Sequence, residues 1–251
     1  MTEIERDEKA LENGEWSVPL PAAILLDLDD TILAYGGAEE CWRTVCSMFV
    51  SQVGVSSVEE LLATINGVRE WYWSDLERHR QGRLVMQETR RKIVSMAFSN
   101  LGIDCPDVAR DLADTYAAVR EGGVKPFPGA IDTIQHFRNR GVRLGLVTNG
   151  GSEMQRGKLE RFGLESYFDC ILIEGEFGVG KPDERVFCHM LEQFGVAASD
   201  TWMVGDDLQR DIAGAQVLGM FTIWVDWRGN GLPESGPVRP DRIIRSITEL
   251  R

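Results

Sequence analysis

Three aspartates lie within four positions of the stretch ILLDLDDTIL, residues 24–33: Asp27, Asp29 and Asp30. Apolar residues precede and follow them, so the carboxylates adjoin a segment that we expect to be buried. Like charges placed this close together are unfavourable unless a cation compensates them. Carboxylate oxygens are ligands that Mg²⁺ prefers, and Mg²⁺ usually combines a few of them with water and phosphate oxygens. The stretch therefore predicts a site that holds a divalent cation.

Further polar residues follow later apolar runs of the chain. They are Thr148, Asn149 and Gly150 after VRLGLV, Lys181 in the loop EFGVGKPDE, and Asp206 and Asp207 after WMV. Ligands of an open parallel sheet bind outside the carboxyl ends of its strands, so we expect all these residues at one rim. Mg²⁺ between Asp27 and Asp206 would compensate the crowded negative charge, and Lys181 would add a second cation.

Four stretches occur in a recognisable order: DLDDT, VTNG, GKPD and VGDDLQRD. They resemble the motifs of the haloacid dehalogenase (HAD) superfamily of phosphohydrolases, and the resemblance covers the chain from about residue 22 to its end. A helical insertion after the first motif resembles the cap of the largest branch of that superfamily. The stretch TNGGSEMQRGKLERFGLESYFD, followed by KPDERVF, looks most like the N-acylneuraminate-9-phosphatase and pyrimidine 5'-nucleotidase type.

The resemblance implies a role for each catalytic residue. Asp27 looks like the nucleophile that forms an aspartyl-phosphate, and Asp29 like the general acid that later acts as the base. Thr148 would donate its hydroxyl to a phosphoryl oxygen, with Asn149 and Gly150 shaping the substrate pocket. The resemblance also implies that Lys181 neutralises charge on the nucleophile and on the transferring group.

The resemblance implies Mg²⁺ as the cofactor, bound by the Asp27 carboxylate, the Asp29 backbone carbonyl and Asp206. Asp207 and Asp211 would hold metal-bound waters or orient Lys181. Asp30 is interpreted as a turn residue and Asp183 as the start of a helix.

Three other functions remain open. A 2-haloacid dehalogenase uses the same nucleophile, but that branch lacks the second aspartate and needs no metal, whereas this chain has Asp29. A phosphosugar mutase would share every core residue named above. A non-catalytic protein could use the same rim only to bind a partner.

We predict the strands and helices that position these residues from the spacing of apolar residues and from the residue types that begin and end helices. Short apolar runs typical of strands buried on both faces are AAILLDL, VRLGLVTN, FDCILI, TWMVGD and FTIWVD. Segments of helical period that begin at Pro or Ser and end at Gly separate the later runs. Strand and helix in alternation predict an α/β fold, a Rossmann-like parallel sheet with helices on both faces.

Residues 35–122 interrupt this alternation with four or five helical stretches and no convincing strand. We therefore predict an inserted helical cap domain there, an α/β core domain from residues 17–34 and 123–251, and a possibly disordered acidic tail over residues 1–16. YGG and GGVKPFPG would be the hinges.

Aromatic and basic residues of the cap are candidate substrate contacts, although an aromatic side chain packs more often into a core. The candidates are Trp42, Arg43, Trp71, Arg78 and Arg80, and packing into the cap core is the preferred interpretation for Trp71. Three polar residues lie on the helix after Thr148, and one interpretation is that they are no more than a solvated face: Gln155, Arg156 and Lys158.

The amino-acid composition limits the kinds of molecule that the protein is expected to bind. Lys and Arg total 27 against 40 Asp and Glu, a net charge of −13, which disfavours nucleic acid and leaves a small phosphorylated metabolite as the expected partner. The five cysteines are scattered without a CxxC pair, and no apolar run reaches membrane length, so we expect a cytoplasmic protein without a membrane partner. Both a monomer and a homodimer remain open.

Overall fold

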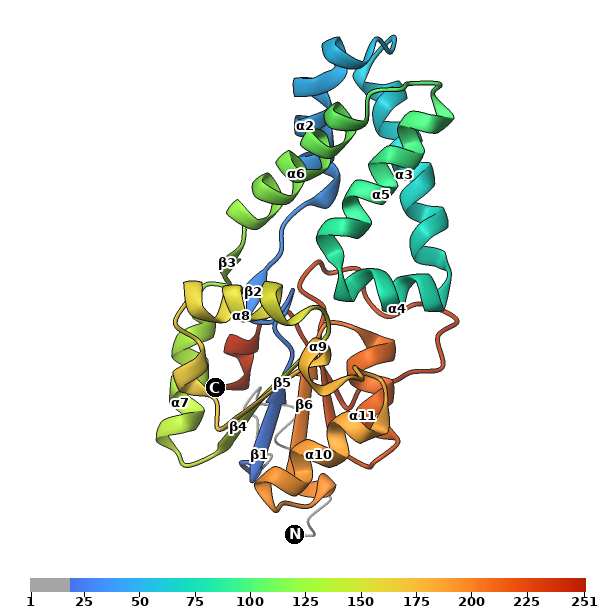
Figure 1. Ribbon diagram of the computed structural model, residues 1–251. Coiled ribbons are helices and arrows are strands. Elements are labelled where there is room, and N and C mark those ends of the chain that lie inside the picture. Colours follow the sequence, from blue (N-terminus) through green and yellow to red (C-terminus); the bar gives the residue numbers. More distant parts are fainter. Residues whose placement is uncertain (1–18) are drawn as a thin grey trace.

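The computed structural model describes residues 19–251 and has a six-stranded sheet at its centre (Figure 1). The strand order is β5-β4-β1-β6-β7-β8, and each neighbouring pair runs parallel. The strands are β1 (Ala23–Leu26), β4 (Arg143–Thr148), β5 (Cys170–Ile173), β6 (Thr201–Gly205), β7 (Phe221–Val225) and β8 (Arg242–Ile244). The predicted parallel α/β sheet is confirmed, and each of the five predicted runs contains one strand.

Side chains of β1 enter two buried layers in turn, because successive residues of a strand point to opposite faces. Ile24 and Leu26 belong to the layer that contains Phe137, whereas Leu25 belongs to the layer that contains Phe187. Both faces of the strand are thus covered, which is why its sequence is continuously apolar instead of alternating.

Helices of the core cover the two faces of the sheet. Residues of α7 (Ala130–Asn139) and α8 (Ser152–Arg161) pack into the first layer, and residues of α10 (Glu184–Phe194) and α11 (Gly214–Gln216) into the second. The remaining core elements are short: η1 (Glu165–Tyr167), α9 (Glu174–Phe177), η2 (Ala198–Asp200), the π-helix η3 (Leu208–Ala213) and η4 (Ile247–Leu250).

Five helices form a separate layer beyond the sheet edge at which β1 ends (Figure 1). We call them the cap: α2 (Ala38–Val53), α3 (Val58–Ser74), α4 (Leu76–Leu84), α5 (Met86–Asn100) and α6 (Pro106–Gly122). Their buried side chains form a cluster of their own, in which Trp42 stacks on Tyr116 with ring centroids 3.6 Å apart. The inserted helical segment thus has its own apolar core.

The two chain segments that connect the cap to the sheet pair with each other. Strand β2 (Leu33–Ala34) and strand β3 (Lys125–Pro126) run antiparallel. These two strands and β8 were not predicted, because two or three residues are too few to show a period. The short ladder joins the hinges that the sequence suggested at YGG and GGVKPFPG.

The predicted tail over residues 1–16 lies outside the described residues, and the domain boundaries at 34/35 and 122/123 stay predictions. Within residues 19–251, no single helix is long and apolar enough to cross a membrane. The pair α2 and α3 meets such a test only jointly, with a bend of 114° between the two helices.

Candidate active site

The strand ends bring the predicted residues together. Asp27 follows β1 and donates its backbone N–H to the Val204 carbonyl of β6, at 2.9 Å. Thr148 is the last residue of β4, and Asp206 directly follows β6. Because β4 and β6 flank β1 in parallel, these three residues lie at the same edge of the sheet.

Lys181 is the cation at the centre of this rim. Its Nζ lies 2.6 Å from Asp27 Oδ1 and 2.6 Å from Asp211 Oδ1, and its side chain is only 2% exposed. Asn149 holds the lysine's backbone from both sides: its Nδ2 donates to the Lys181 carbonyl and its Oδ1 accepts from the Lys181 N–H, each at 2.8 Å. The amide of Asn149 is thus engaged in positioning Lys181.

Asp27, Asp206 and Asp211 form what we call the carboxylate cluster, because one oxygen of each lies within 4.8 Å of the others. Asp207 is outside it: its carboxylate caps η3 by accepting from the N–H groups of Gln209 and Arg210. Lys181 pairs with Asp27 and Asp211, so its one positive charge cannot balance the three carboxylates when all of them are ionised. This donor set and this charge fit one divalent cation with oxygen ligands.

Burial, and after it the charges of neighbouring aspartates, raises the pKa values of Asp27 and Asp206 in the cluster. Burial raises the pKa of Asp27 to about 7, although Lys181 opposes the shift. Burial and the charges of Asp27 and Asp211 raise the pKa of Asp206 to about 9. Burial alone would lower the pKa of Lys181, but Asp211 and Asp27 raise it above its ordinary value. A bound cation would stabilise the ionised carboxylates.

Gly205 makes room for Asp211 in the motif VGDD. A Cβ at Gly205 would lie only 2.2 Å from Asp211 Oδ2, which is far inside van der Waals contact. Asp211 Oδ2 instead accepts from the Asp207 N–H at 3.0 Å. The glycine therefore lets the turn fold tightly enough for Asp211 to reach Lys181.

The helix after β4 contributes two side chains that were interpreted as a solvated face. Gln155 is 1% exposed and donates to the hydroxyl of Thr148 and, at 3.2 Å, to Asp29 Oδ2. Lys158 donates to both oxygens of Asp29, at 2.8 and 2.6 Å. For these two residues the solvated-face interpretation was wrong. Arg156 points elsewhere and pairs with Glu165 and Glu176.

A buried ion pair joins the cap to the core beside Gly150. Arg83 at the end of α4 donates to both oxygens of Glu174, at 2.6 and 2.7 Å, and the Glu174 side chain is 2% exposed. Glu174 Oε2 also accepts from the N–H of Gly150, at 3.0 Å. The backbone of Gly150, predicted to help shape the pocket, is thus tied to the cap through Glu174.

Two further contacts bring α4 onto the core. The Nε2 atom of His79 lies 3.0 Å from a guanidinium nitrogen of Arg210, and its Nδ1 lies 3.4 Å from one of Arg83. A Cβ at Gly151 would lie 2.4 Å from the Leu84 carbonyl oxygen, so the backbones touch there. Sequence reasoning missed this interface, because no local pattern marks a contact between α4 and loops so distant in the chain.

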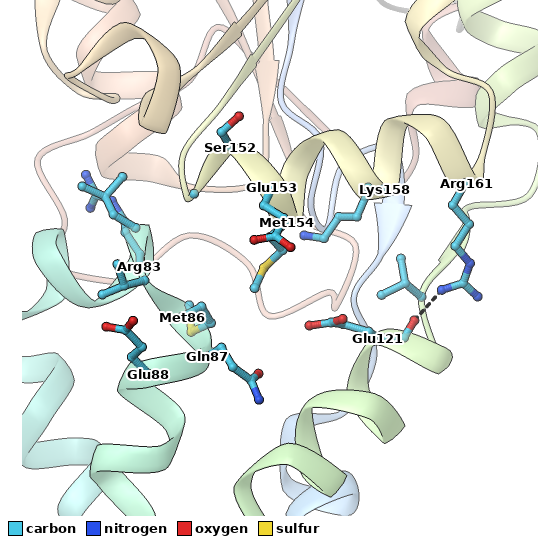
Figure 2. A pocket seen from close by; sticks show the side chains of 15 residues that line it. Arg83, Met86, Gln87, Glu88, Glu121, Ser152, Glu153, Met154, Lys158 and Arg161 are labelled. Carbon is cyan, nitrogen blue, oxygen red and sulfur yellow. Dashed lines mark hydrogen bonds between the residues drawn. The ribbon is translucent and has the colours of Figure 1, made fainter. Parts of the chain in front are cut away.

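A cavity of about 730 Å³ lies between cap and core, beside this interface (Figure 2). The cap contributes residues 83–88, and the core contributes residues of α8, including Lys158 and Arg161. Figure 2 shows Lys158 and Arg161 on the α8 wall opposite the cap residues Met86 and Gln87. Through Lys158 the cavity adjoins Asp29.

None of the five predicted cap residues belongs to the described lining of this cavity. Trp42 is buried in the cap, Arg43 pairs with Glu59, and Arg80 pairs with Glu77. The interpretation of Trp71 as a cap-core residue was wrong, since its side chain is 50% exposed and stacks under Arg78 at 4.0 Å.

The structure agrees with the interpretation of Asp30 as a turn residue and of Asp183 as the start of a helix. Asp30 has a φ of 58° and accepts from the N–H of Tyr35 at 3.0 Å, so it shapes the turn after β1. Asp183 caps α10 by accepting from the N–H of Arg185. Both carboxylates therefore have local structural partners.

The family model for haloacid dehalogenase-like hydrolases matches residues 21–219. The chain therefore belongs to the haloacid dehalogenase-like hydrolase family, as the motifs suggested. Its similarity to proteins named as phosphatases agrees with the expected class of phosphoric monoester hydrolases.

Three curated relatives match parts of the chain. A phosphoserine phosphatase from Thermus thermophilus is 39% identical over 64% of this chain and 63% of its own length. The pyrimidine 5'-nucleotidase YjjG from Escherichia coli is 37% identical over 50% of this chain and 55% of its own. The N-acylneuraminate-9-phosphatase of Rattus norvegicus is 39% identical over 43% and 44%. The chain thus spans less than two thirds of each of these relatives.

Two solved structures match nearly the whole chain. The HAD-hydrolase YfnB from Bacillus subtilis, described as bound to magnesium, has a TM-score of 0.70 and 26% identity, covering 92% of this chain and 97% of that one. A 2-haloacid dehalogenase from Pseudomonas syringae has a TM-score of 0.61 and 28% identity, covering 92% and 96%. Since one of these structures is a dehalogenase, the fold alone does not fix the chemistry of the site.

Proposed function

We propose that this protein is a Mg²⁺-dependent phosphomonoesterase that hydrolyses a small phosphorylated metabolite through an aspartyl-phosphate on Asp27. The observation that carries the proposal is the pairing of Asp27 with the buried ammonium of Lys181, beside a second aspartate at Asp29. Phosphoryl transfer depends mainly on positioning and charge neutralisation, which this rim can supply.

In the proposed reaction, a carboxylate oxygen of Asp27 attacks phosphorus while the bond from phosphorus to the leaving oxygen breaks. Asp29 gives its proton to that oxygen, so the leaving group departs as an alcohol and Asp29 becomes a carboxylate. Asp29 then takes a proton from the water that attacks the phosphorus of the aspartyl-phosphate. The products are inorganic phosphate and free Asp27.

Other side chains position the phosphoryl group. The hydroxyl of Thr148 donates to a phosphoryl oxygen, with its oxygen held by the Gln155 amide. The ammonium of Lys181 neutralises charge on Asp27 and on the transferring group. Asn149 fixes the backbone of Lys181, and Asp211 fixes its ammonium, so both act as positioning residues.

The carboxylate cluster is the proposed metal site. Asp27 and Asp206 would bind Mg²⁺ together with the Asp29 backbone carbonyl, and Asp211 lies near enough to hold the ion directly or through water. The ion supplies positive charge to the phosphoryl oxygens when it is bound. Asp207 has only an indirect role in this proposal: its side chain caps η3, the element that carries Asp211.

The presence of Asp29 favours a phosphatase over a dehalogenase, because a halide leaving group needs no acid. The two oxygens of Asp29 face Gln155 and Lys158, so the residue is integrated in the site. A phosphosugar mutase would use the same core residues, and it would return an isomerised sugar phosphate instead of free phosphate.

All five cysteines are free, which supports a reducing compartment such as the cytoplasm.

The test is phosphate release with and without Mg²⁺ from p-nitrophenyl phosphate, sugar phosphates, nucleotides and phosphoserine. We expect Mg²⁺-dependent release that Asp27→Asn abolishes. Asp30→Asn is the matched control: it alters a neighbouring aspartate that serves the turn, so we expect activity within about threefold of the wild type. Release that persists in Asp27→Asn would refute the nucleophile, and release from none of the compounds would favour a binding protein.

A further inference from the structure

Lys158 contacts both oxygens of Asp29 in an ion pair whose lysine is buried and whose aspartate is partly exposed. Its Nζ lies 2.8 Å from Oδ1 and 2.6 Å from Oδ2, and the side chains of Lys158 and Asp29 are 8% and 33% exposed. The lysine comes from α8, so the contact is made by the fold and not by a local turn. An ion pair this well formed restrains the orientation of Asp29.

This restraint conflicts with the acid step of the proposed function, on which the inference rests. Both oxygens of Asp29 accept hydrogen bonds from Lys158, and Oδ2 also accepts from Gln155. An acid has to turn one oxygen, carrying a proton, toward the leaving group. Lys158 must therefore release at least one oxygen of Asp29 before the leaving group can be protonated.

The surroundings of Lys158 suggest where its ammonium goes. Lys158 lines the cavity between cap and core, and its Nζ lies 4.4 Å from the centre of the Tyr35 ring. Arg161 lines the same wall one helical turn later (Figure 2). Its guanidinium donates only to the backbone carbonyls of Glu121 and Gly122 among the described residues. Two cations with spare hydrogen-bonding capacity thus face the cavity from α8.

The other charged residues that line the cavity are paired with residues outside its lining or are solvated. Arg83 is taken by Glu174, and Glu121 pairs with Arg90. Glu88 and Glu153 also line the cavity, but both are exposed to water. The nearly buried charge nearest the acid is therefore the cation of Lys158.

We infer that Lys158 is a specificity residue that an anionic group of the substrate draws away from Asp29. The favoured substrates are phosphate monoesters whose leaving group carries a second anion, either a carboxylate or another phosphate. When that anion pairs with Lys158, the released carboxylate of Asp29 takes up a proton from solvent and gives it to the leaving oxygen, and the carboxylate that results returns to Lys158 after the alcohol departs. Monoesters without a second anion leave the ion pair in place and react slowly.

The test compares substrates that differ only by the second anion. Phosphoserine and phosphoethanolamine differ by a carboxylate, and ribulose 1,5-bisphosphate and ribulose 5-phosphate differ by a phosphate. We expect the wild type to favour the more anionic member of at least one pair by roughly 10-fold to 100-fold in kcat/KM, the range of a hydrogen bond to a charged group. The pair that responds identifies the anion.

Lys158→Met and Lys158→Gln should both reduce that preference to within about twofold, because neither side chain carries a charge. Lys158→Arg should keep it, since the guanidinium also binds carboxylates and phosphates. Lys92→Met is the matched control, which removes the same charge from an exposed position on α5 and should leave the preference unchanged.

A merely structural role for Lys158 would lower kcat/KM for both members of a pair and leave their ratio intact, which would overturn the inference. Equal rates for both members in the wild type would also overturn it, while Mg²⁺-dependent release from p-nitrophenyl phosphate would still support the phosphatase function. Release from none of these compounds would overturn both proposals.

Discussion

Replacing Arg83 with methionine removes the cap's half of the ion pair with Glu174. The pair is buried, since the two side chains are 15% and 2% exposed, and it has two short hydrogen bonds. Methionine keeps much of the length of the side chain and removes its charge. The carboxylate of Glu174 then keeps only the N–H of Gly150 among the partners described here.

The expected loss can be worked out from this geometry. Removing one partner of a buried ion pair costs about 3 to 5 kcal/mol where the other charge stays buried. Opening of the cap would let water reach Glu174, so we expect the lower value, about 3 kcal/mol, and expect it to fall on the closed arrangement of cap and core. Since 1.4 kcal/mol is a factor of ten, closure should weaken roughly 100-fold.

The assay is kcat/KM for the best substrate of the phosphate-release panel. We expect a fall of roughly 100-fold in Arg83→Met, while Arg80→Met, which removes an exposed pair from the same helix, changes little. The double variant Arg83→Met with Glu174→Gln should recover most of the loss, because no buried charge is then left unpaired. Effects of the two substitutions that simply add would refute the coupling between cap and core.

Burial and the guanidinium groups of Arg210 and Arg83 lower the pKa of His79, so protonation opposes the contact between α4 and the core. The contact should be strongest above pH 6.5 and weaken as the pH falls below it, which scattering at several pH values would show as expansion, and His79→Gln should remove this dependence. Mg²⁺ binding should tighten as the pH rises through about 7 and about 9, because two carboxyls of the cluster lose their protons there; calorimetry in buffers of different ionisation enthalpy would detect the released protons. Gly205→Ala should displace Asp211 from Lys181 and weaken Mg²⁺ binding at least tenfold by the same calorimetry, with the wild-type affinity as the contrary result.

The sheet and the rim could be predicted because both depend on local signals. Strands buried on both faces are continuously apolar, as in AILL of β1, and the end of each strand was readable from the first polar residue after it. The rule that parallel strands present ligands at their carboxyl ends then placed Asp27, Thr148 and Asp206 together. The structure brings these residues to one edge.

Contacts between distant helices could not be predicted in the same way. The pattern of α8 places polar residues at positions 155 and 158, but only the packing of that helix against the loop after β1 buries them on Asp29. In α3 the adjacent residues Trp71 and Tyr72 are both large and aromatic, and the cap buries Tyr72 while Trp71 stays exposed. The periodicity of apolar residues alone cannot say which of two adjacent aromatic residues is buried.

The most direct test of the central claim is to identify the covalent intermediate. Asp29→Asn should accumulate it, because water then lacks its base, and p-nitrophenyl phosphate should still form it, because its leaving group needs no proton. After acid quenching and proteolysis, mass spectrometry should find one phosphoryl group on the peptide that contains Asp27, and none in the variant that also carries Asp27→Asn. Turnover without any phosphorylated peptide, or a phosphoryl group on another residue, would contradict the proposed mechanism.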